Sequence, residues 1–324
     1  MSGEPCRASV VIPVKNGGEL LGRVLDAVLA QETPWPYEVL VIDSGSRDGS
    51  RQQVQARGVR LHEIPPTEFG HGRTRNLGAA LTSGAFIVFI TQDALPADQH
   101  WLARLVAAAE QSPETAGAFG RHRAYAESGP VVGREIEEFF RGFGNSAQVV
   151  RLDDPQRYRQ DEGYRQYLHY FSSNNACLRR TVWERHPLPE VEFAEDQLWA
   201  RTVIEAGYAK AYAPDAVVYH SHSLGVWESC RRAFDEAGAL QRLFGYDLVP
   251  GLRHLLIQLR LLTQRDWRWI REAELGPSER TRRLLRTPWL NLARLTGLYL
   301  GARQRRLPSW LVLRFSRDKA LQRS

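Results

Sequence analysis

The sequence is poor in cysteine and contains no hydrophobic run long enough to cross a membrane. Its three cysteines, Cys6, Cys177 and Cys230, are far apart and odd in number. This pattern excludes a disulfide framework and a cysteine-based zinc site, and it suits a reducing cytosol. No stretch approaches the roughly 20 apolar residues of a membrane-spanning helix. The chain enters a β-branched run almost at once, so we expect no secretory signal and a cytoplasmic protein.

Basic residues are scarce in the first 250 residues and abundant after them. The net charge is +6, but residues 251–324 hold 17 Lys/Arg against 5 Asp/Glu, whereas residues 1–250 hold 26 against 32. A nucleic-acid enzyme usually carries its basic patch around the active domain, so we expect no nucleic-acid partner. The basic, tryptophan-rich tail favours an anionic membrane surface, on the inner face of the cell membrane. Packing on the rest of the chain and a homodimer interface remain open for the same segment.

Strand-like and helix-like segments alternate over residues 1–110. Four apolar, β-branched runs predict strands, and helical spacing of apolar residues fills the gaps between them. This rhythm predicts an α/β fold, in which helices flank a mainly parallel central sheet on both faces. The predicted strands are residues 8–14, 38–43, 59–64 and 85–90.

The rest of the chain is harder to read. Residues 115–170 are irregular apart from a helix at 135–143, and order returns at 171–180 with a helix at 195–206 and a strand at 216–220. A C-terminal helical extension follows Pro250, and breaks are expected at Gly276-Pro277 and Thr287-Pro288. Its predicted helices are residues 252–263, 266–273 and 279–300. We therefore expect a catalytic domain over 1–225, with a donor half to about 110 and an acceptor half after it, and a helical region over 226–324.

Ligands of parallel sheets bind beyond the carboxyl ends of the strands, and acidic residues follow two of these strands. Asp43 ends the second predicted strand, where its carboxylate can accept a hydrogen bond from a pyrimidine N–H or a ribose, although Asp-Ser-Gly is also an ordinary turn. Asp93 follows the most apolar strand. There it can bind a hard divalent cation or cap a helix.

Two further acidic residues and two histidines lie late in this part of the chain. Glu195 and Asp196 begin a predicted helix, where they either favour the first turn electrostatically or supply a general base for an acceptor hydroxyl. His220 and His222 end a predicted strand and point to the same side. They are either metal ligands or polar surface.

The glycine-rich segment Phe69–Gly78 contains Arg73 and Arg75 and leads into a predicted helix. Glycine, arginine and a helix N-terminus all favour an anionic ligand such as a diphosphate. The segment matches neither the Walker pattern nor the dinucleotide-binding pattern.

Taken in their order, these segments resemble the family 2 glycosyltransferases of GT-A fold. The resemblance covers residues 8–222, and His71–Gly78 with Thr91–Ala94 look most like the bacterial rhamnosyltransferase branch, whose members commonly use a dTDP-activated deoxysugar. The segments that carry it are Val10–Asn16, Val41–Ser50, Arg75–Gly78, Phe89–Asp93, Glu195-Asp196 and His220.

The resemblance implies an inverting glycosyltransferase that acts in bacterial cell-surface polysaccharide synthesis. It would move a sugar, most specifically L-rhamnose from dTDP-rhamnose, from a nucleotide-diphosphate donor to a hydroxyl of a glycan or lipid-linked saccharide. Asp196 would be the catalytic base, with Glu195 beside it. A divalent cation, Mg²⁺ or Mn²⁺, would be held by Asp93, His220 and His222.

The resemblance also implies a pocket for the nucleotide sugar. Asn175 could instead lie in a turn, and Thr91 replaces the first acidic residue of the family's D-x-D metal motif, which leaves one carboxylate there. The implied pocket residues are Pro13, Val14, Lys15, Asn16, Asp43, Ser44, Ser46, Arg75, Asn76, Thr91, Gln92 and Asn175.

Two other classes of protein remain open. A sugar-nucleotide nucleotidyltransferase also combines an α/β nucleotide domain with a divalent metal, but the segment Lys15–Gly18 is a poor version of its glycine-rich loop. A non-catalytic glycan- or nucleotide-binding protein would suit the incomplete metal motif. The joint presence of Asp93, Asp196 and His220 argues against it.

Overall fold

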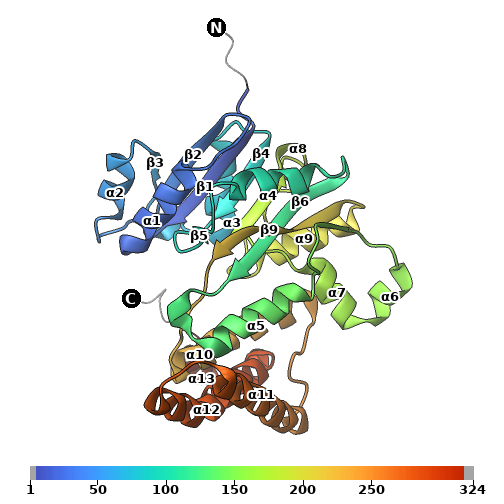
Figure 1. The fold of residues 1–324 in the computed structure, drawn as a ribbon. Helices are drawn as coiled ribbons and strands as arrows, with labels where there is room; N and C mark the ends of the chain where they lie inside the picture. The colour runs from blue at the N-terminus through green and yellow to red at the C-terminus, as the bar shows by residue number, and fades with distance from the viewer. Residues whose placement is uncertain (1–4, 317–324) are drawn as a thin grey trace. The chain divides into compact units, whose positions relative to one another are not determined.

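The computed structural model describes residues 5–316, which divide into two compact units. The first unit contains the chain up to Tyr125 and residues Ile136–His220, and the second contains Ala126–Glu135 and the chain from Ser221 onward. Within residues 5–316, all nine strands belong to the first unit, and the second is built from helices (Figure 1).

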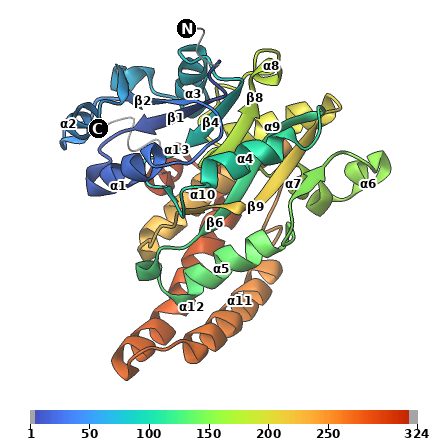
Figure 2. The same cartoon turned by 45° about the horizontal axis from the view of Figure 1, so that its top comes forward.

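The first unit is organised around a nine-stranded sheet of order β3-β2-β1-β4-β8-β6-β9-β5, with β7 paired to β9. Its strands are β1 Ala8–Val14, β2 Tyr37–Asp43, β3 Arg60–Glu63, β4 Phe86–Ile90, β5 Leu95–Pro96, β6 Thr115–Arg123, β7 Gln148–Val150, β8 Asn175–Arg179 and β9 Ala209–Tyr219. Figure 2 shows β2, β1, β4 and β8 in this order. The first four strands of the path are parallel, whereas β8 is antiparallel to both β4 and β6. The α/β fold is confirmed, with a parallel first half and a mixed second half.

Helices cover both faces of the sheet because side chains alternate along each strand. Val10 and Ile12 face the core under α1 (Gly18–Leu29) and α4 (Trp101–Glu110), whereas Val11 faces the core under α3 (His71–Ala80) and α9 (Glu195–Glu205). Both cores are fully buried around β1. This packing fixes where the carboxyl ends of β1, β2 and β4 meet.

The prediction that residues 115–170 are irregular is wrong for their first part. Residues Thr115–Arg123 form β6, which pairs with both β8 and β9. Gly117 and Gly120 weaken the strand pattern in the sequence, yet a Cβ atom there would lie 2.5 Å from the Cys177 carbonyl oxygen and 2.2 Å from that of Ala216. The glycines therefore allow neighbouring backbones to approach closely. Helices α5 (Pro130–Arg141), α6 (Pro155–Gln160) and α7 (Glu162–His169) follow, with the short α2 (Ser50–Ala56) and α8 (Arg180–Trp183) elsewhere.

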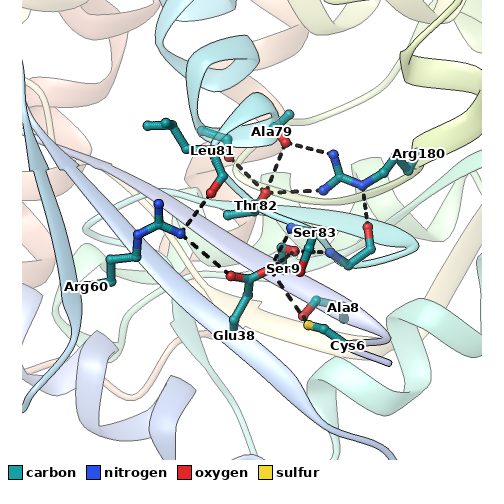
Figure 3. A network of polar contacts seen from close by, with 12 residues as sticks. Cys6, Ala8, Ser9, Glu38, Arg60, Ala79, Leu81, Thr82, Ser83 and Arg180 are labelled. Carbon is teal, nitrogen blue, oxygen red and sulfur yellow. Dashed lines mark hydrogen bonds and ion pairs between the residues drawn. The ribbon is translucent and has the colours of Figure 1, made fainter. Parts of the chain in front are cut away.

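A polar network ties together the amino ends of β1 and β2 (Figure 3). The Glu38 carboxylate accepts hydrogen bonds from the Ser9 hydroxyl at 2.9 Å and from the backbone N–H of Ser83 at 2.7 Å. Nearby, the Arg180 guanidinium donates to the carbonyl oxygens of Ala79 and Gly84. This end of the sheet is closed by satisfied polar groups, so it leaves the carboxyl ends of the strands as the place for a ligand.

The second unit consists mainly of α10 (Val226–Phe244), α11 (Leu252–Glu272), α12 (Pro277–Gly301) and α13 (Ser309–Phe315). The expected break before Asp266 is wrong, because α11 is continuous. The expected break at Thr287-Pro288 is also wrong, because Pro288 lies inside α12. Proline cannot donate to the carbonyl oxygen four residues earlier, and the Trp267 indole N–H donates to that Leu284 oxygen at 2.9 Å instead. No helix within residues 5–316 is long and apolar enough to cross a membrane.

Candidate active site

Two loops at the carboxyl ends of β1 and β2 are held together by side-chain hydrogen bonds. The Asn16 side chain accepts from the backbone N–H of Arg47 at 2.8 Å, and the Ser46 hydroxyl accepts from the N–H of Asn16 at 2.8 Å. Asn16 has a φ of 52°, which asparagine tolerates better than most residues. Asn16 and Ser46 therefore shape this end of the sheet through the backbone. Similar bonds run from Gly17 to Ser50 and from Gly18 to Asp48.

Asp43 lies at the end of β2 with one carboxylate oxygen used and one unused. Its Oδ1 accepts from the backbone N–H groups of Gly45 at 3.0 Å and Ser46 at 2.9 Å. Its Oδ2 is buried and has no hydrogen-bond partner. A buried acceptor without a donor is costly, so this atom marks a place where a bound donor group would be stabilised.

Three other residues predicted for the pocket lie around the same strand ends. Ser44 donates its hydroxyl to the Val14 carbonyl oxygen at 3.1 Å and is buried, which joins β2 to β1. Pro13 and Val14 occupy the last two positions of β1, paired with Ile42 and Asp43 of β2. Ser44 therefore has a structural contact that its predicted role does not include.

The segment after β4 is tied to the end of β1. The Gln92 side-chain amide accepts from the backbone N–H of Lys15 at 2.8 Å and donates to its carbonyl oxygen at 3.2 Å. The Thr91 hydroxyl oxygen is buried without a partner. Gln92 thus uses its side chain within the protein, whereas Thr91 keeps an unused polar atom.

Asp93 and His220 come together from distant parts of the sequence. The Asp93 Oδ1 atom lies 3.7 Å from Nε2 of His220, and the hydroxyl of Tyr125 donates to the Asp93 carbonyl oxygen at 3.1 Å. A carboxylate oxygen and an imidazole nitrogen at this spacing fit a Mg²⁺ or Mn²⁺ ion between them. His222, the third predicted ligand, belongs to the second unit, so its part in this group stays a prediction.

A buried cluster of charged groups joins α3 to the start of α9. The Arg75 guanidinium pairs with Glu195 at 3.2 Å, and both side chains are less than 8% exposed. The Ser173 hydroxyl donates to Glu195 at 2.9 Å, and the Ser173 backbone N–H donates to Asp196 at 2.8 Å. Glu195 therefore positions Arg75, and Ser173 fixes the orientation of the Asp196 carboxylate.

The surroundings of Asp196 change the pKa of its carboxyl group. Burial, and then the charge of Glu195, raise the pKa of Asp196 to about 7. The N–H groups of Ser173 and Gln197 and the positive charge of Arg75 oppose this rise. A carboxylate with a raised pKa near neutrality is a candidate proton acceptor.

Two amides predicted to bind the nucleotide sugar are used by the protein itself. Asn175 is fully buried, accepts from the Trp101 indole N–H at 2.8 Å and donates to the Ala216 carbonyl oxygen at 2.9 Å. Asn76 donates to the Leu188 carbonyl oxygen at 2.8 Å, and its own oxygen accepts from the indole N–H of Trp183. These contacts give both amides a structural role, and their part in binding the nucleotide sugar stays a prediction.

Two residues near the site were missed from the sequence. Ser173 carries no signal of its own, because a serine beside asparagines is typical of a turn. His122 lies on β6, its ring centroid is 5.4 Å from that of His220, and its Nε2 atom is buried without a hydrogen-bond partner. His122 was missed because residues 115–170 were interpreted as irregular, so the sequence did not predict the strand that carries it.

The layout points to a class of protein before any comparison. Parallel strands that end near Asp43 and Asp93, an Asp93–His220 pair, and a buried carboxylate with a raised pKa at Asp196 are features expected of a nucleotide-sugar transferase of GT-A fold. Known proteins make the assignment specific. The profile of glycosyl transferase family 2 matches residues 9–185, and the chain belongs to this family. It is a glycosyltransferase.

Two relatives match most of the chain. The O-antigen chain rhamnosyltransferase RfbN of Salmonella typhimurium (strain LT2) is 32% identical over 278 residues, which is 82% of this chain and 85% of the relative. The O-antigen chain rhamnosyltransferase WbaN of Salmonella anatum is 27% identical over 274 residues, 82% of this chain and 84% of the relative.

A solved structure supports the fold. The mannosyltransferase PcManGT from Pyrobaculum calidifontis, in complex with GDP-Man and Mn²⁺, matches with a TM-score of 0.58 over 94% of this chain and 89% of its own. Its sequence identity is 18%, so this likeness concerns the fold alone.

Proposed function

We propose that the chain transfers a sugar with inversion of the anomeric centre, and that Asp196 is the general base. One observation carries this proposal. Asp196 lies in the first turn of α9, its carboxylate is oriented by Ser173, and its pKa is raised to about 7. General bases work best when their pKa lies near the working pH, and such proton transfer contributes about 10²–10⁴-fold in rate.

The chemistry is a single in-line displacement. The acceptor oxygen forms a bond to the anomeric carbon while the bond from that carbon to the diphosphate oxygen breaks, and the hydroxyl proton passes to Asp196. The Ser173 N–H holds Oδ2 and the Gln197 N–H holds Oδ1, so the carboxylate is oriented before the acceptor arrives.

The donor would bind at the carboxyl ends of β1, β2 and β4. We assign the unused Asp43 Oδ2 to the N–H of a pyrimidine base or to a ribose hydroxyl, and the guanidinium of Arg75 to the diphosphate. Asp93 and His220 would hold a Mg²⁺ or Mn²⁺ ion. Such an ion neutralises charge on a departing diphosphate.

The most specific donor we propose is dTDP-L-rhamnose, and the acceptor is a glycan or a lipid-linked saccharide of a bacterial surface polysaccharide. The O-antigen rhamnosyltransferases that cover more than four fifths of the chain support both choices. A pyrimidine nucleotide also suits the acceptor atom offered by Asp43. A cytoplasmic location is part of the same proposal.

A donor panel tests the proposal. The full chain is mixed with Mn²⁺ or Mg²⁺, a lipid-linked saccharide extract and dTDP-rhamnose, UDP-glucose or GDP-mannose, and the released nucleoside diphosphate is measured. We expect dTDP to be released fastest, and dTDP-rhamnose to raise the melting temperature most. Preference for another donor would refute the rhamnose assignment. Release of diphosphate from a nucleoside triphosphate would instead indicate a nucleotidyltransferase.

A further inference from the structure

The helical hairpin of α11 and α12 exposes large apolar side chains that nothing in the described chain covers. On α11 these are Leu252, Leu256, Ile257 and Leu261, and on α12 they are Leu285 and Trp289. Leu256, Leu285 and Trp289 are each more than 60% exposed. The two helices already bury another face against each other through Leu255 and Leu295. The exposed residues are therefore a second apolar surface.

The spacing of these residues shows that they form stripes. They fall into three pairs four residues apart, Leu252 with Leu256, Ile257 with Leu261, and Leu285 with Trp289. Residues four apart in a helix lie on the same face, one turn above the other. Single exposed apolar residues are common on soluble proteins, but grouped ones mark an interaction surface.

Arginines surround the stripes and give the hairpin one sign of charge. The two helices contain ten arginines and three acidic residues, and each acidic residue is paired with an arginine: Asp266 with Arg265, Glu272 with Arg134, and Glu279 with Arg283. Arg253, Arg260 and Arg268 are exposed, and among residues 5–316 none of the three forms an ion pair. The free charge at this surface is therefore positive.

We propose that this surface, defined by the three apolar pairs and Arg253, Arg260 and Arg268, docks on an anionic lipid bilayer. Leucine and tryptophan enter the headgroup region while arginines contact acidic headgroups, which is how interfacial helices bind membranes. A second copy of the chain is less favoured, because two such surfaces would bring unpaired arginines together. Neither helix can span the bilayer, so the association is peripheral.

Vesicle co-sedimentation of the full chain tests this proposal. One set of vesicles contains phosphatidylcholine with one third phosphatidylglycerol, and the other contains phosphatidylcholine alone. We expect binding to the anionic set at low salt, weakened by added salt. Replacing Arg253, Arg260 and Arg268 by Gln should lower binding at least about tenfold, since each basic residue near an anionic surface contributes about fivefold. The pair Leu256→Ser and Trp289→Ser should also reduce it.

A matched control separates the surface from net charge. Arg23, Arg159 and Arg185 are exposed arginines of the first unit, and their replacement by Gln removes the same charge. This variant should keep binding to vesicles, and all variants should keep their melting temperature. No binding at low salt, or equal loss in the control, would overturn the proposal. So would a dimer in sedimentation velocity that the serine variants dissociate without any change in vesicle binding.

Discussion

At the scale of single residues, the two oxygens of the Asp43 carboxylate differ in their hydrogen bonds. Its Oδ1 fixes the turn after β2, and its buried Oδ2 accepts nothing. Replacing Asp43 by asparagine keeps one oxygen for the turn and puts an NH₂ group in place of Oδ2. This NH₂ group would then face the N–H of the pyrimidine base, and both groups are hydrogen-bond donors.

We therefore predict that Asp43→Asn lowers the affinity for dTDP by at least about tenfold, because an unpaired buried polar group costs about 1–3 kcal/mol. The unfolding midpoint should change little, since the turn bonds remain. Isothermal titration calorimetry measures the affinity and a urea curve measures the stability. Unchanged dTDP affinity would contradict the proposal that Asp43 binds the pyrimidine base.

The pKa of Asp196 gives two further expectations at this scale. Burial and the Glu195 charge raise it to about 7, above the ordinary value of 3.8. A base must be ionised, so kcat/KM should fall as pH decreases through about 7. A flat profile between pH 6 and 8 would argue that another group takes the proton.

The raised pKa of Asp196 also makes the folding stability of the protein depend on pH. Because the folded pKa is raised, the charged carboxylate opposes folding, and this penalty grows from about pH 4 and is complete above about pH 7. Asp196→Asn removes this charge, but its NH₂ group must face the backbone N–H of Ser173 or Gln197, which lowers stability at every pH. The fall in melting temperature between pH 5 and pH 8 should therefore be smaller in Asp196→Asn than in the parent, by roughly 2–4 °C for each kcal/mol of the charge penalty, as differential scanning calorimetry can measure. An equal fall in both proteins would contradict the raised pKa.

At the scale of elements, two glycines set the packing of α10 on α12. A Cβ atom at Gly297 would lie 2.2 Å from the carbonyl oxygen of Cys230, and one at Gly301 would lie 2.2 Å from that of Phe234. Both neighbours are backbone atoms, which cannot rotate away. The second unit depends on this close approach.

Gly297→Ala should therefore destabilise the second unit by about 1–3 kcal/mol, the usual cost of overpacking. Gly276→Ala is the matched control, since Gly276 precedes α12, has a φ of −61° and has open space around it. Urea unfolding followed by tryptophan fluorescence measures both. Equal stabilities for the two variants would show that the helices can separate without cost.

Some strands and helices could be predicted from the sequence, and others could not. Continuous apolar runs predicted β1, β2 and β4, because residues of these strands are buried on both faces of the sheet. The strand β6 was not predicted, because Gly117 and Gly120 interrupt its apolar pattern. These glycines allow close contact with neighbouring strands, which no local pattern in the sequence encodes. Likewise, Pro288 predicted a break, yet a tryptophan 21 residues away in the chain satisfies the carbonyl oxygen that it leaves free.

In the candidate site, the positions of several residues could be predicted from the sequence, but the contacts between them could not. Asp43, Asp93 and His220 lie at or just after the ends of predicted strands, and Asp196 lies at the start of a predicted helix, so their places in these elements could be predicted. The pairing of Arg75 with Glu195 joins residues 120 positions apart. The side-chain oxygens of Asn175 and Asn76 accept hydrogen bonds from Trp101 of α4 and Trp183 of α8. Such contacts arise only when the elements pack.

At the scale of the whole molecule, the family match and the relatives show that the chain is a glycosyltransferase, and the mechanism proposed for it depends on Asp196 as the general base. The most direct test compares the parent with Asp196→Asn in the presence of Mn²⁺, dTDP-rhamnose and the saccharide extract. We predict that the variant loses transfer by at least about 10²-fold and binds dTDP with nearly the parent affinity. Transfer at the parent rate in Asp196→Asn would contradict the account.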